Sequence, residues 1–440
     1  MAVPYGRPMI PLASRTRSWL ARWSSILPLL AAEATIWIGF GALLPILPIY
    51  FRQHGTDLWT LGIVIAAWPA ARLVGEPLFG WVADRAPRKP LMIAGLIGTA
   101  VATVLPLGFV GPLAFLVLRA AAGLFAALYD PAARGYLVDA NPPERQGETF
   151  GLYGAAQMGG LMLGPAIGGF AVGLTHDPTV VFWVAAIALG TAATLILVRV
   201  PELRASRHRG PNGGGIADAT APTIDRPARL LNRYLVAATV INVGWYFAGG
   251  VYEVIWSLYL TSIGATIELV GLTFVAFALP VFVVGPLFGR QVDRRGGYAA
   301  LVGGMAVVVG CAPVYPLVPQ VWFVVALSLV EGTAFAVVSP ALFALVARAS
   351  PPGRSSTAQG IFGAAGTAGT IVASILAGFL AAIDMRFPYF LVGAAGAAAL
   401  VSGLVIAGRG LRPMLRPVRG DQAAAHGALP PTFAETPPFG

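Results

Sequence analysis

Long apolar segments follow one another along most of this chain, separated by short polar or Pro/Gly-rich breaks. A segment of about 20 apolar residues is long enough to cross a lipid bilayer as one helix. We count twelve such segments and predict that each forms a membrane-spanning helix. The predicted spans are 26–50, 58–83, 89–109, 113–139, 149–173, 179–199, 235–261, 267–289, 298–318, 320–347, 356–382 and 388–408.

A short string occurs twice, 209 positions apart. Pro77–Arg85 reads PLFGWVADR, and Pro286–Arg294 reads PLFGRQVDR. Moving the first six predicted spans by the same offset places them within a few residues of the last six. A period this long is far beyond the units of solenoid proteins, so each copy is half of a pseudo-symmetric protein. We therefore predict an all-α membrane protein with two six-helix bundles in the same orientation.

Polar segments divide the chain further. Residues 201–233 are rich in Arg, Gly and Pro, which is typical of a flexible linker. The segment from about Arg409 has the same character and few apolar anchors, so we expect disorder there. The predicted parts are a cytoplasmic N-terminal segment 1–25, a first bundle 26–200, a cytoplasmic linker 201–233, a second bundle 234–409 and a cytoplasmic tail 410–440.

Composition supports a membrane protein. Of the 440 residues, 57% are hydrophobic and 11% are charged, against about 25% charged in soluble proteins, and the mean hydropathy is +0.76. Cys311 is the only cysteine and lies inside an apolar span, which excludes an intramolecular disulfide and a cysteine-rich metal site.

The formal charge of +10 is unevenly distributed between the two sides of the predicted spans. With the N-terminus inside, the outer loops hold only Arg52 and Arg386, and the other loop and terminal arginines lie on the inner side. By the positive-inside rule, we predict a protein of the plasma (inner) membrane with both termini in the cytoplasm. Anionic lipid headgroups account for the positive charge, and we predict no nucleic-acid partner.

Twelve spans, a parallel two-fold repeat and a long central cytoplasmic loop resemble the major facilitator superfamily. The segment Gly80–Lys89 is similar to that family's signature loop, Gly-x-Leu-x-Asp-Arg-x-Gly-Arg-Lys, with Val82 and Pro87 as departures. The resemblance implies a conformational switch in which these charges form and break pairs between the two bundles. Asp139 resembles the acidic residue that closes the fourth helix and is implied as a partner of the loop arginines. The implied switch residues are Gly80, Asp84, Arg85, Arg88, Lys89 and Asp139, with Gly289, Asp293 and Arg294 in the second copy.

The fifth span contains GLMLGPAIGG, residues 160–169, which matches the Gly-x-x-x-Gly-Pro-x-x-Gly-Gly pattern of antiporter members of that superfamily. Glycines at i, i+4 and i+8 form a smooth strip along one helix face, and a proline bends the helix. This strip would allow another helix to pack at contact distance and seal the interface between the bundles; ordinary helix packing is the alternative interpretation. The motif residues are Gly160, Gly164, Pro165, Gly168 and Gly169.

Arg119 lies inside the fourth span, where an unpaired charge would cost about 2.5–3.5 kcal/mol or more. Its surroundings resemble the superfamily's second motif, whose arginine is associated with proton transfer. A structural ion pair with no transport role is the alternative. Through the repeat, Glu331 corresponds to Ala122, one turn from Arg119, so Arg119 and Glu331 are candidates to pair in one conformational state.

Four candidate proton carriers, all acidic residues, lie in the first, fourth, seventh and tenth spans, which line the central cavity in the superfamily. Protons need carriers, and carboxylates inside a membrane are the usual ones. Glu33 is our leading site for a proton or a cation. By contrast, Arg72 and Glu76 are interpreted as an intrahelical pair that supports the signature loop. The candidate carboxylates are Glu33, Asp130, Glu253 and Glu331.

Aromatic residues gather in the same spans. Trp37, Trp245 and Tyr246 are predicted to form cavity walls for lipophilic or cationic substrates through burial and cation–π contact. Trp256 and Tyr259 are interpreted instead as anchors at the membrane surface, where aromatic residues near helix ends are common.

These features together favour a proton-coupled antiporter that exports small amphipathic or drug-like molecules, acts as a monomer and needs no cofactor or metal. No ATP-binding Gly-x-x-x-x-Gly-Lys-Ser/Thr loop is present in the sequence. A proton-coupled uptake carrier is the main alternative. A membrane enzyme is disfavoured because the four histidines are scattered, and a non-transporting sensor because no soluble signalling domain is evident.

Overall fold

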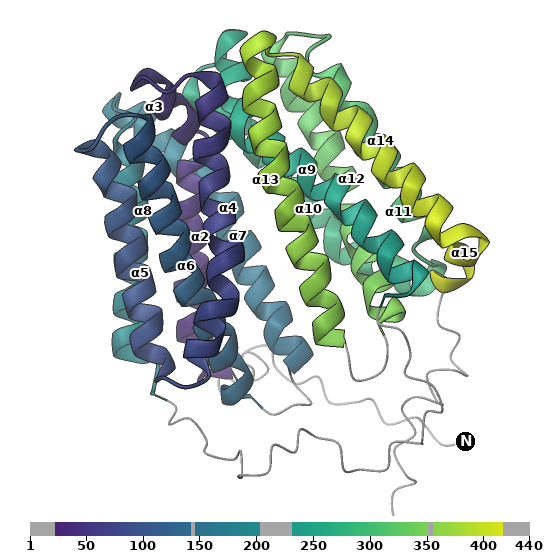
Figure 1. The fold of residues 1–440 in the computed structure, drawn as a ribbon, viewed down its shortest axis with the longest axis horizontal. Coiled ribbons are helices and arrows are strands. Elements are labelled where there is room, and N and C mark those ends of the chain that lie inside the picture. Colours follow the sequence, from purple (N-terminus) through teal and green to yellow (C-terminus); the bar gives the residue numbers. More distant parts are fainter. Residues whose placement is uncertain (1–22, 142–145, 203–230, 351–354, 417–440) are drawn as a thin grey trace, which may run out of the picture.

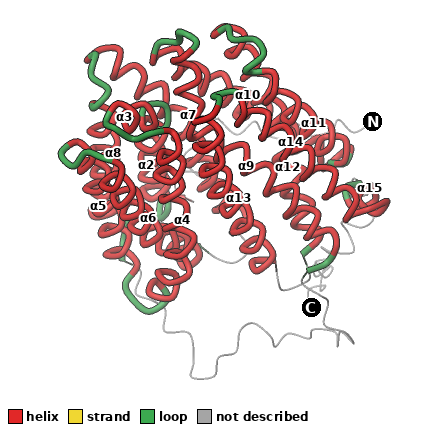
Figure 2. The backbone as a smooth tube through the Cα atoms, turned by 45° about the horizontal axis from the view of Figure 1, so that its top comes forward, coloured by secondary structure: helices red, strands yellow, loops and turns green. Residues whose placement is uncertain are grey.

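A computed structural model describes residues 23–141, 146–202, 231–350 and 355–416 of the chain. Within these ranges the protein is all-helical, as predicted (Figure 2). The helices are α2 Leu27–Leu43, α3 Leu47–Gln53, α4 Leu58–Ala83, α5 Arg88–Val104, α6 Pro112–Ala140, α7 Gln146–Thr175, α8 Val180–Arg199, α9 Arg233–Ser262, α10 Ile267–Arg295, α11 Tyr298–Val314, α12 Val321–Ala349, α13 Ser355–Ile383, α14 Phe387–Ala407 and α15 Leu411–Met414, with short 3-10 turns η1 Leu105–Leu107 and η3 Gly408–Gly410.

Each of the twelve predicted spans corresponds to a helix in the described ranges. Nine of the described helices are long and apolar enough to cross a membrane by themselves. The first predicted span is a bent pair, α2 and α3, whose axes meet at 41°. Pro45 lies in that break, and proline cannot donate the backbone hydrogen bond that would continue the helix. Two further apolar stretches are shorter, residues Ile267–Val281 within α10 and Tyr298–Val314, which is α11.

The helices form two bundles, α2–α8 and α9–α14, that lie side by side (Figure 1). In the first bundle α2 packs against α7, and α4 against α6; in the second, α9 packs against α13, and α10 against α12. These pairs correspond through the 209-residue repeat, so the same packing is built twice. The predicted division at residues 200 and 234 falls within one residue of the end of α8 and the start of α9.

The two bundles touch through two crossed helix pairs, α4 with α13 and α7 with α10. Repeat-related glycines lie at both contacts. A Cβ on Gly62 would overlap the carbonyl oxygen of Ser374, and one on Gly378 would lie 2.5 Å from the carbonyl oxygen of Leu58. At the other contact a Cβ on Gly271 would lie 3.1 Å from the carbonyl oxygen of Pro165. Backbones therefore approach most closely where α4 meets α13.

Both contacts lie at the same end of the molecule. They involve the first turns of α4 and α10 and the last turns of α7 and α13, at the upper end in Figure 1. Toward the opposite end, where the 84–87 loop lies, the bundles diverge (Figure 1). The protein is thus closed on one side and open on the side that the arginine distribution predicts to be cytoplasmic.

The segment after α14 departs from the expected disorder. Arg348 at the end of α12 donates hydrogen bonds to the carbonyl oxygens of Met414 (2.9 Å) and Arg416 (2.7 Å). The backbone N–H of Gly297 donates to Leu415, and the side chains of Leu411 and Leu415 are buried. The prediction of disorder was wrong for residues 411–416, because these two leucines anchor the segment to the second bundle. Residues 417–440 lie outside the described part of the chain.

Gly62→Val tests the contact at the closed end. Overpacking typically costs about 1–3 kcal/mol, which corresponds to a shift of roughly 5- to 150-fold toward a state with this end separated. Spin labels at Gln53→Cys and Arg386→Cys in a Cys311→Ser background report the separation, and we expect longer distances in Gly62→Val. Gly190→Val is the control, because a Cβ at Gly190 meets nothing within 4 Å. Unchanged distances in Gly62→Val would contradict the role given to this contact.

Arg348→Ala tests the anchored C-terminal segment. We expect the midpoint of thermal unfolding in detergent to fall by a few degrees, because loss of two partly exposed hydrogen bonds costs about 1–2 kcal/mol. Arg409→Ala, at an exposed position of the same segment, is the matched control. Equal midpoints for the two variants would show that the segment adds nothing to stability.

Candidate functional site

A cavity of about 1140 Å³ lies between the bundles. Its lining comes mainly from α2, α4, α6 and α7 of the first bundle and α9, α10, α12 and α13 of the second. A volume of this size is sufficient for a drug-sized molecule. Because the bundles touch at one end and diverge at the other, the cavity has a floor near the α4–α13 contact.

Two groups of aromatic rings face the cavity, one from each bundle. In the first, Phe40 lies between Trp37 and Trp68, with ring centroids 5.4 and 5.0 Å away. In the second, the rings of Trp245 and Phe335 are 4.0 Å apart, and Phe277 adds a third ring 5.3 Å from Phe335. The predicted wall residues Trp37, Trp245 and Tyr246 all line the cavity.

Trp256 and Tyr259 are not surface anchors, and that interpretation was wrong. The indole of Trp256 is buried, lines the cavity and donates to the hydroxyl of Thr273 at 2.8 Å. The hydroxyl of Tyr259 donates to the carbonyl oxygen of Tyr315 at 2.8 Å. Both rings pack against Tyr389, so partners within the second bundle satisfy their polar atoms.

An ion pair joins the two bundles. Nη2 of Arg119 on α6 lies 3.0 Å from Oε1 of Glu253 on α9, and both side chains are largely buried. The expected pairing of Arg119 with Glu331 is absent from this conformation, because Glu331 is held by other groups. Glu253 matches no family motif and corresponds to Leu44 in the repeat. The sequence placed it among the candidate carboxylates and showed that Arg119 needs an acidic partner, but it did not indicate that the two residues pair.

Glu331 lines the large cavity without a cationic partner among the described residues. The hydroxyl of Tyr315 donates to Oε2 at 2.6 Å, and that of Tyr252 donates to Oε1 at 3.1 Å. The side chain is 3% exposed. A carboxylate held only by neutral donors can gain a proton or an external cation without first breaking an ion pair.

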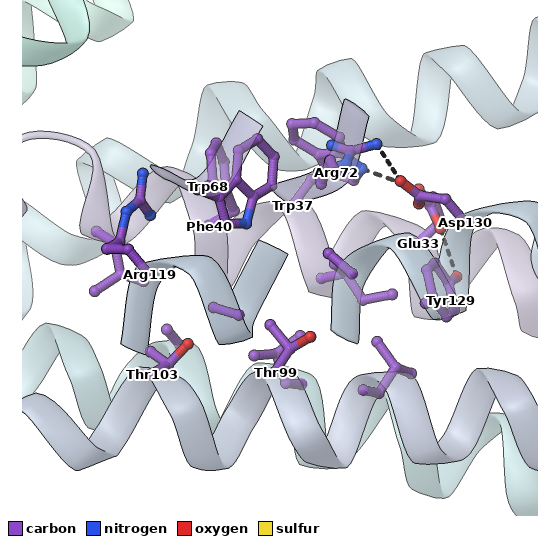
Figure 3. Close-up of a pocket in the computed structure, with 17 residues that line it drawn as sticks. Glu33, Trp37, Phe40, Trp68, Arg72, Thr99, Thr103, Arg119, Tyr129 and Asp130 are labelled. Atoms are coloured by element: carbon purple, nitrogen blue, oxygen red, sulfur yellow. Dashed lines mark hydrogen bonds and ion pairs between the residues drawn. The ribbon is translucent and has the colours of Figure 1, made fainter. Parts of the chain in front are cut away.

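Glu33 is fully buried and accepts three hydrogen bonds from neutral donors, of which Trp37 and Tyr129 are labelled in Figure 3. Tyr129 donates to Oε2 at 2.6 Å, and Gln157 and Trp37 donate to Oε1 at 2.7 and 2.9 Å. Burial opposes the charge of this carboxylate, whereas three donors favour it. Trp37 and Gln157 line the large cavity, while Glu33 itself lines a separate cavity of about 80 Å³ inside the first bundle.

Asp130 belongs to a network of two acids and two arginines at the cavity wall. Arg72 pairs with Asp130 and, at 2.7 Å, with Glu76; Arg134 lies 3.7 Å from Glu76. The predicted intrahelical pair therefore exists, but its assignment to loop support was wrong, because all four side chains line the large cavity. The spacing of Arg72 and Glu76 in the sequence revealed their contact within α4. It did not reveal the contact of Arg72 with Asp130 on α6.

The signature loop has one of its implied pairs. Nη2 of Arg88 lies 3.1 Å from Oδ2 of Asp139, which confirms the predicted partnership. Arg85 bonds back to the carbonyl oxygen of Trp81 and lies over its ring. Asp84 is exposed and Lys89 half-buried, with no ion pair to either in the described residues.

A Cβ on Gly80 would meet only Pro131, at 3.9 Å, so close packing does not require glycine there in this conformation. The surroundings of Gly289 and the side chains of Asp293 and Arg294 lie outside the described part of the structure.

The glycine motif of α7 contacts different helices on two of its faces. Gly160, Gly164 and Gly168 pack against α2 of the same bundle; a Cβ on Gly164 would lie 2.5 Å from the carbonyl oxygen of Ile38. The expectation that this strip seals the interface between the bundles was therefore wrong. The neighbouring face, with Pro165 and Gly169, meets Gly271 of the second bundle. The rotation of α7 about its own axis determines which face contacts α2 and which contacts α10.

The sequence matches the family model for the Major Facilitator Superfamily over residues 29–254 and again over 234–435. The chain belongs to the major facilitator superfamily. It is therefore a multi-pass membrane transporter, and the two matches begin near the starts of the two bundles.

Related sequences share this membership. An uncharacterized MFS-type transporter of Methanocaldococcus jannaschii is 24% identical over 353 residues, which covers 79% of this chain and 89% of that protein. The quinolone resistance protein NorA of Staphylococcus aureus is 29% identical over 170 residues. That match covers 38% of this chain and 43% of NorA, so the likeness concerns less than half of each protein.

Solved structures share the superfamily fold. The nucleoside transporter NupG has a TM-score of 0.67 and 14% identity, covering 86% of this chain and 98% of NupG. A bacterial homolog of the human lysosomal transporter Spinster, in an inward-facing and unoccupied conformation, has a TM-score of 0.65 and 15% identity, covering 90% of this chain and 96% of that one. At such identities the likeness shows the fold alone.

A double-mutant cycle tests the Arg119–Glu253 pair of this superfamily member. Removing one partner of a buried pair costs about 3–5 kcal/mol, and solvent in the cavity reduces this, so we expect about 1–3 kcal/mol for Arg119→Gln or Glu253→Gln. The double variant is expected to lose less than the sum, because neither charge is left alone. Thermal unfolding of all four proteins measures the coupling; strictly additive losses would show that the pair contributes no interaction energy.

Proposed function

We propose that this transporter exports small amphipathic molecules in exchange for protons by alternating access. The observation that carries the proposal is Glu331, a buried carboxylate that faces the large cavity and has only neutral donors. A proton and a cationic substrate compete for such a group. Competition of this kind is sufficient to couple their opposite movements.

The cavity walls support an amphipathic substrate. Aromatic groups from both bundles provide apolar area, and a cation over such rings gains a further cation–π attraction. Glu331 lies beside the rings of Tyr252 and Tyr315, so a cation near the carboxylate also lies near aromatic faces. A flat molecule with one positive charge combines these contacts.

The ion pair between the bundles supports the conformational part of the proposal. Arg119 and Glu253 join the bundles in the closed-floor conformation. A proton on Glu253 would remove the attraction and favour separation at the floor, which opens the cavity to the opposite side. Release of that proton would restore the pair and the conformation described here.

Two sequence features support export over uptake. Residues 160–169 match the antiporter pattern, and 38% of the chain is related to NorA, which is named for quinolone resistance. We further propose a plasma (inner) membrane location with cytoplasmic termini, which makes the open side cytoplasmic. A monomer is proposed as the working unit, since one chain encloses the cavity.

Everted membrane vesicles with an acidic lumen test the exchange, with ethidium as the probe. We expect wild-type protein to accumulate ethidium in the lumen and to release protons from it; each tenfold difference in proton concentration supplies about 1.4 kcal/mol per proton. Glu331→Gln is expected to lower ethidium-dependent proton release by on the order of tenfold, because its neutral amide cannot exchange a proton.

Glu202→Gln, which changes an exposed carboxylate just after α8, is the control and is expected to behave as wild type. Glu33→Gln and Arg119→Ala extend the test to the other buried charges. If wild-type vesicles show ethidium movement without proton release, the exchange mechanism is wrong. Accumulation driven only by a proton gradient in the same direction as the substrate would indicate an uptake carrier.

A further inference from the structure

The smaller cavity lies inside the first bundle, beside the large cavity (Figure 3). Its volume is about 80 Å³, and its lining comes from α2, α4, α5, α6 and α8. Three aromatic residues, Trp37, Phe40 and Trp68, line both cavities, and so do Arg72 and Asp130. The two cavities are therefore neighbours with a shared lining.

Charged groups lie at the two ends of the smaller cavity. Arg119 lies at one end, and Glu33 and Asp130 lie at the other (Figure 3). Arg119 and Asp130 are both on α6, and the helical rise of 1.5 Å per residue separates them by about 16 Å. The cavity thus extends from Arg119, the partner of Glu253 in the ion pair between the bundles, to the fully buried carboxylate of Glu33.

One donor at the Arg119 end has no partner. Arg119 is 9% exposed and uses Nη2 for Glu253, whereas its buried Nε has no hydrogen-bond partner in the described residues. An unmade hydrogen bond at a buried charged donor is costly, so this N–H is expected to find an acceptor. The smaller cavity is the space that Arg119 lines within the first bundle.

Two hydroxyl groups lie between the ends. Thr103 lies on the Arg119 side of α5, and Thr99 lies one turn further toward Glu33 (Figure 3). The hydroxyl of Thr99 donates to the carbonyl oxygen of Gly95 at 2.8 Å, so its oxygen can still accept. Polar cavities hold water, and at about 30 Å³ per molecule this one has room for two or three.

We infer that the smaller cavity binds a short chain of water molecules that carries protons between the Arg119–Glu253 pair and Glu33. This inference rests on the proposed proton exchange. Glu253 must be ionised to pair with Arg119, so a proton that it carries has to leave when the floor closes. The O–H bond of Glu253 breaks, each water oxygen and the Thr103 oxygen in turn form one O–H bond and break another, and an O–H bond forms on Glu33. Thr99 keeps its hydrogen bond to Gly95 and accepts a hydrogen bond from the water chain.

Arg119 acts here as a positioning residue and keeps its own protons. A water oxygen that accepts from Nε directs its two hydrogens away from the guanidinium, toward Thr103. Glu253 lines the large cavity and Glu33 lines the smaller one, so the path leads from the substrate cavity into the first bundle.

Thr103→Val tests the path, because it removes one hydroxyl with almost no change in shape. In everted vesicles we expect ethidium-dependent proton release to slow at least fivefold, with the ethidium KM within twofold of wild type. Thr103→Ser is expected to restore the rate, and Ala126→Leu, which fills the cavity, is expected to slow it. Thr194→Val is the matched control, since the hydroxyl of Thr194 bonds to the carbonyl oxygen four residues earlier at an exposed position of α8.

Ethidium–ethidium counterflow provides a second readout, because this exchange needs no net proton transfer. We expect counterflow to be unchanged in Thr103→Val, which would exclude a general structural defect. Normal proton release in both Thr103→Val and Ala126→Leu would overturn the water path and leave the proposed exchange intact. Counterflow without any proton release in wild type would overturn both.

Discussion

An ionised side chain inside a bilayer is stable only when partners replace its lost hydration, and this constraint organises the whole protein. Each bundle holds one buried carboxylate on neutral donors, Glu33 in the first and Glu331 in the second. Arg119, the buried cation of the first bundle, finds its acidic partner in the second. The ion pair between Arg119 and Glu253 thus joins two bundles that otherwise touch through helix contacts rich in glycine.

Repetition and asymmetry have different roles in this structure. Gly62 and Gly271 are related by the 209-residue repeat and lie at equivalent contacts between the bundles, so the closing surface is built twice. Buried charges are not repeated: Glu33 corresponds to Asn242, and Arg119 corresponds to Ser328. In the proposed exchange, the symmetric packing would allow the bundles to move against each other, and the asymmetric charges would make that movement sensitive to protons and to substrate.

The second bundle also shows how a repeated position can acquire another use. Arg88 and Asp139 form an ion pair at the open side of the first bundle. Their equivalents, Gly297 and Arg348, bind backbone carbonyl groups of the C-terminal segment instead. At the open side, the first bundle is thus stabilised by an ion pair, and the second by hydrogen bonds to the C-terminal segment. In the proposed exchange the charge pair would break and form again, whereas the chain segment also buries the side chain of Leu411.

The sequence by itself determined the spans, the duplication and the pair of Arg88 with Asp139. Spans follow from the thickness of the bilayer, and the duplication is visible because equivalent residues keep equivalent spacing. Only the tertiary structure decided that Arg119 meets Glu253, that the strip containing Gly164 faces α2, and that Trp256 is a cavity residue. These contacts depend on how each helix is rotated about its axis. Rotation is set by the simultaneous packing of many helices, and in a segment that is apolar all round no local pattern of residues encodes it.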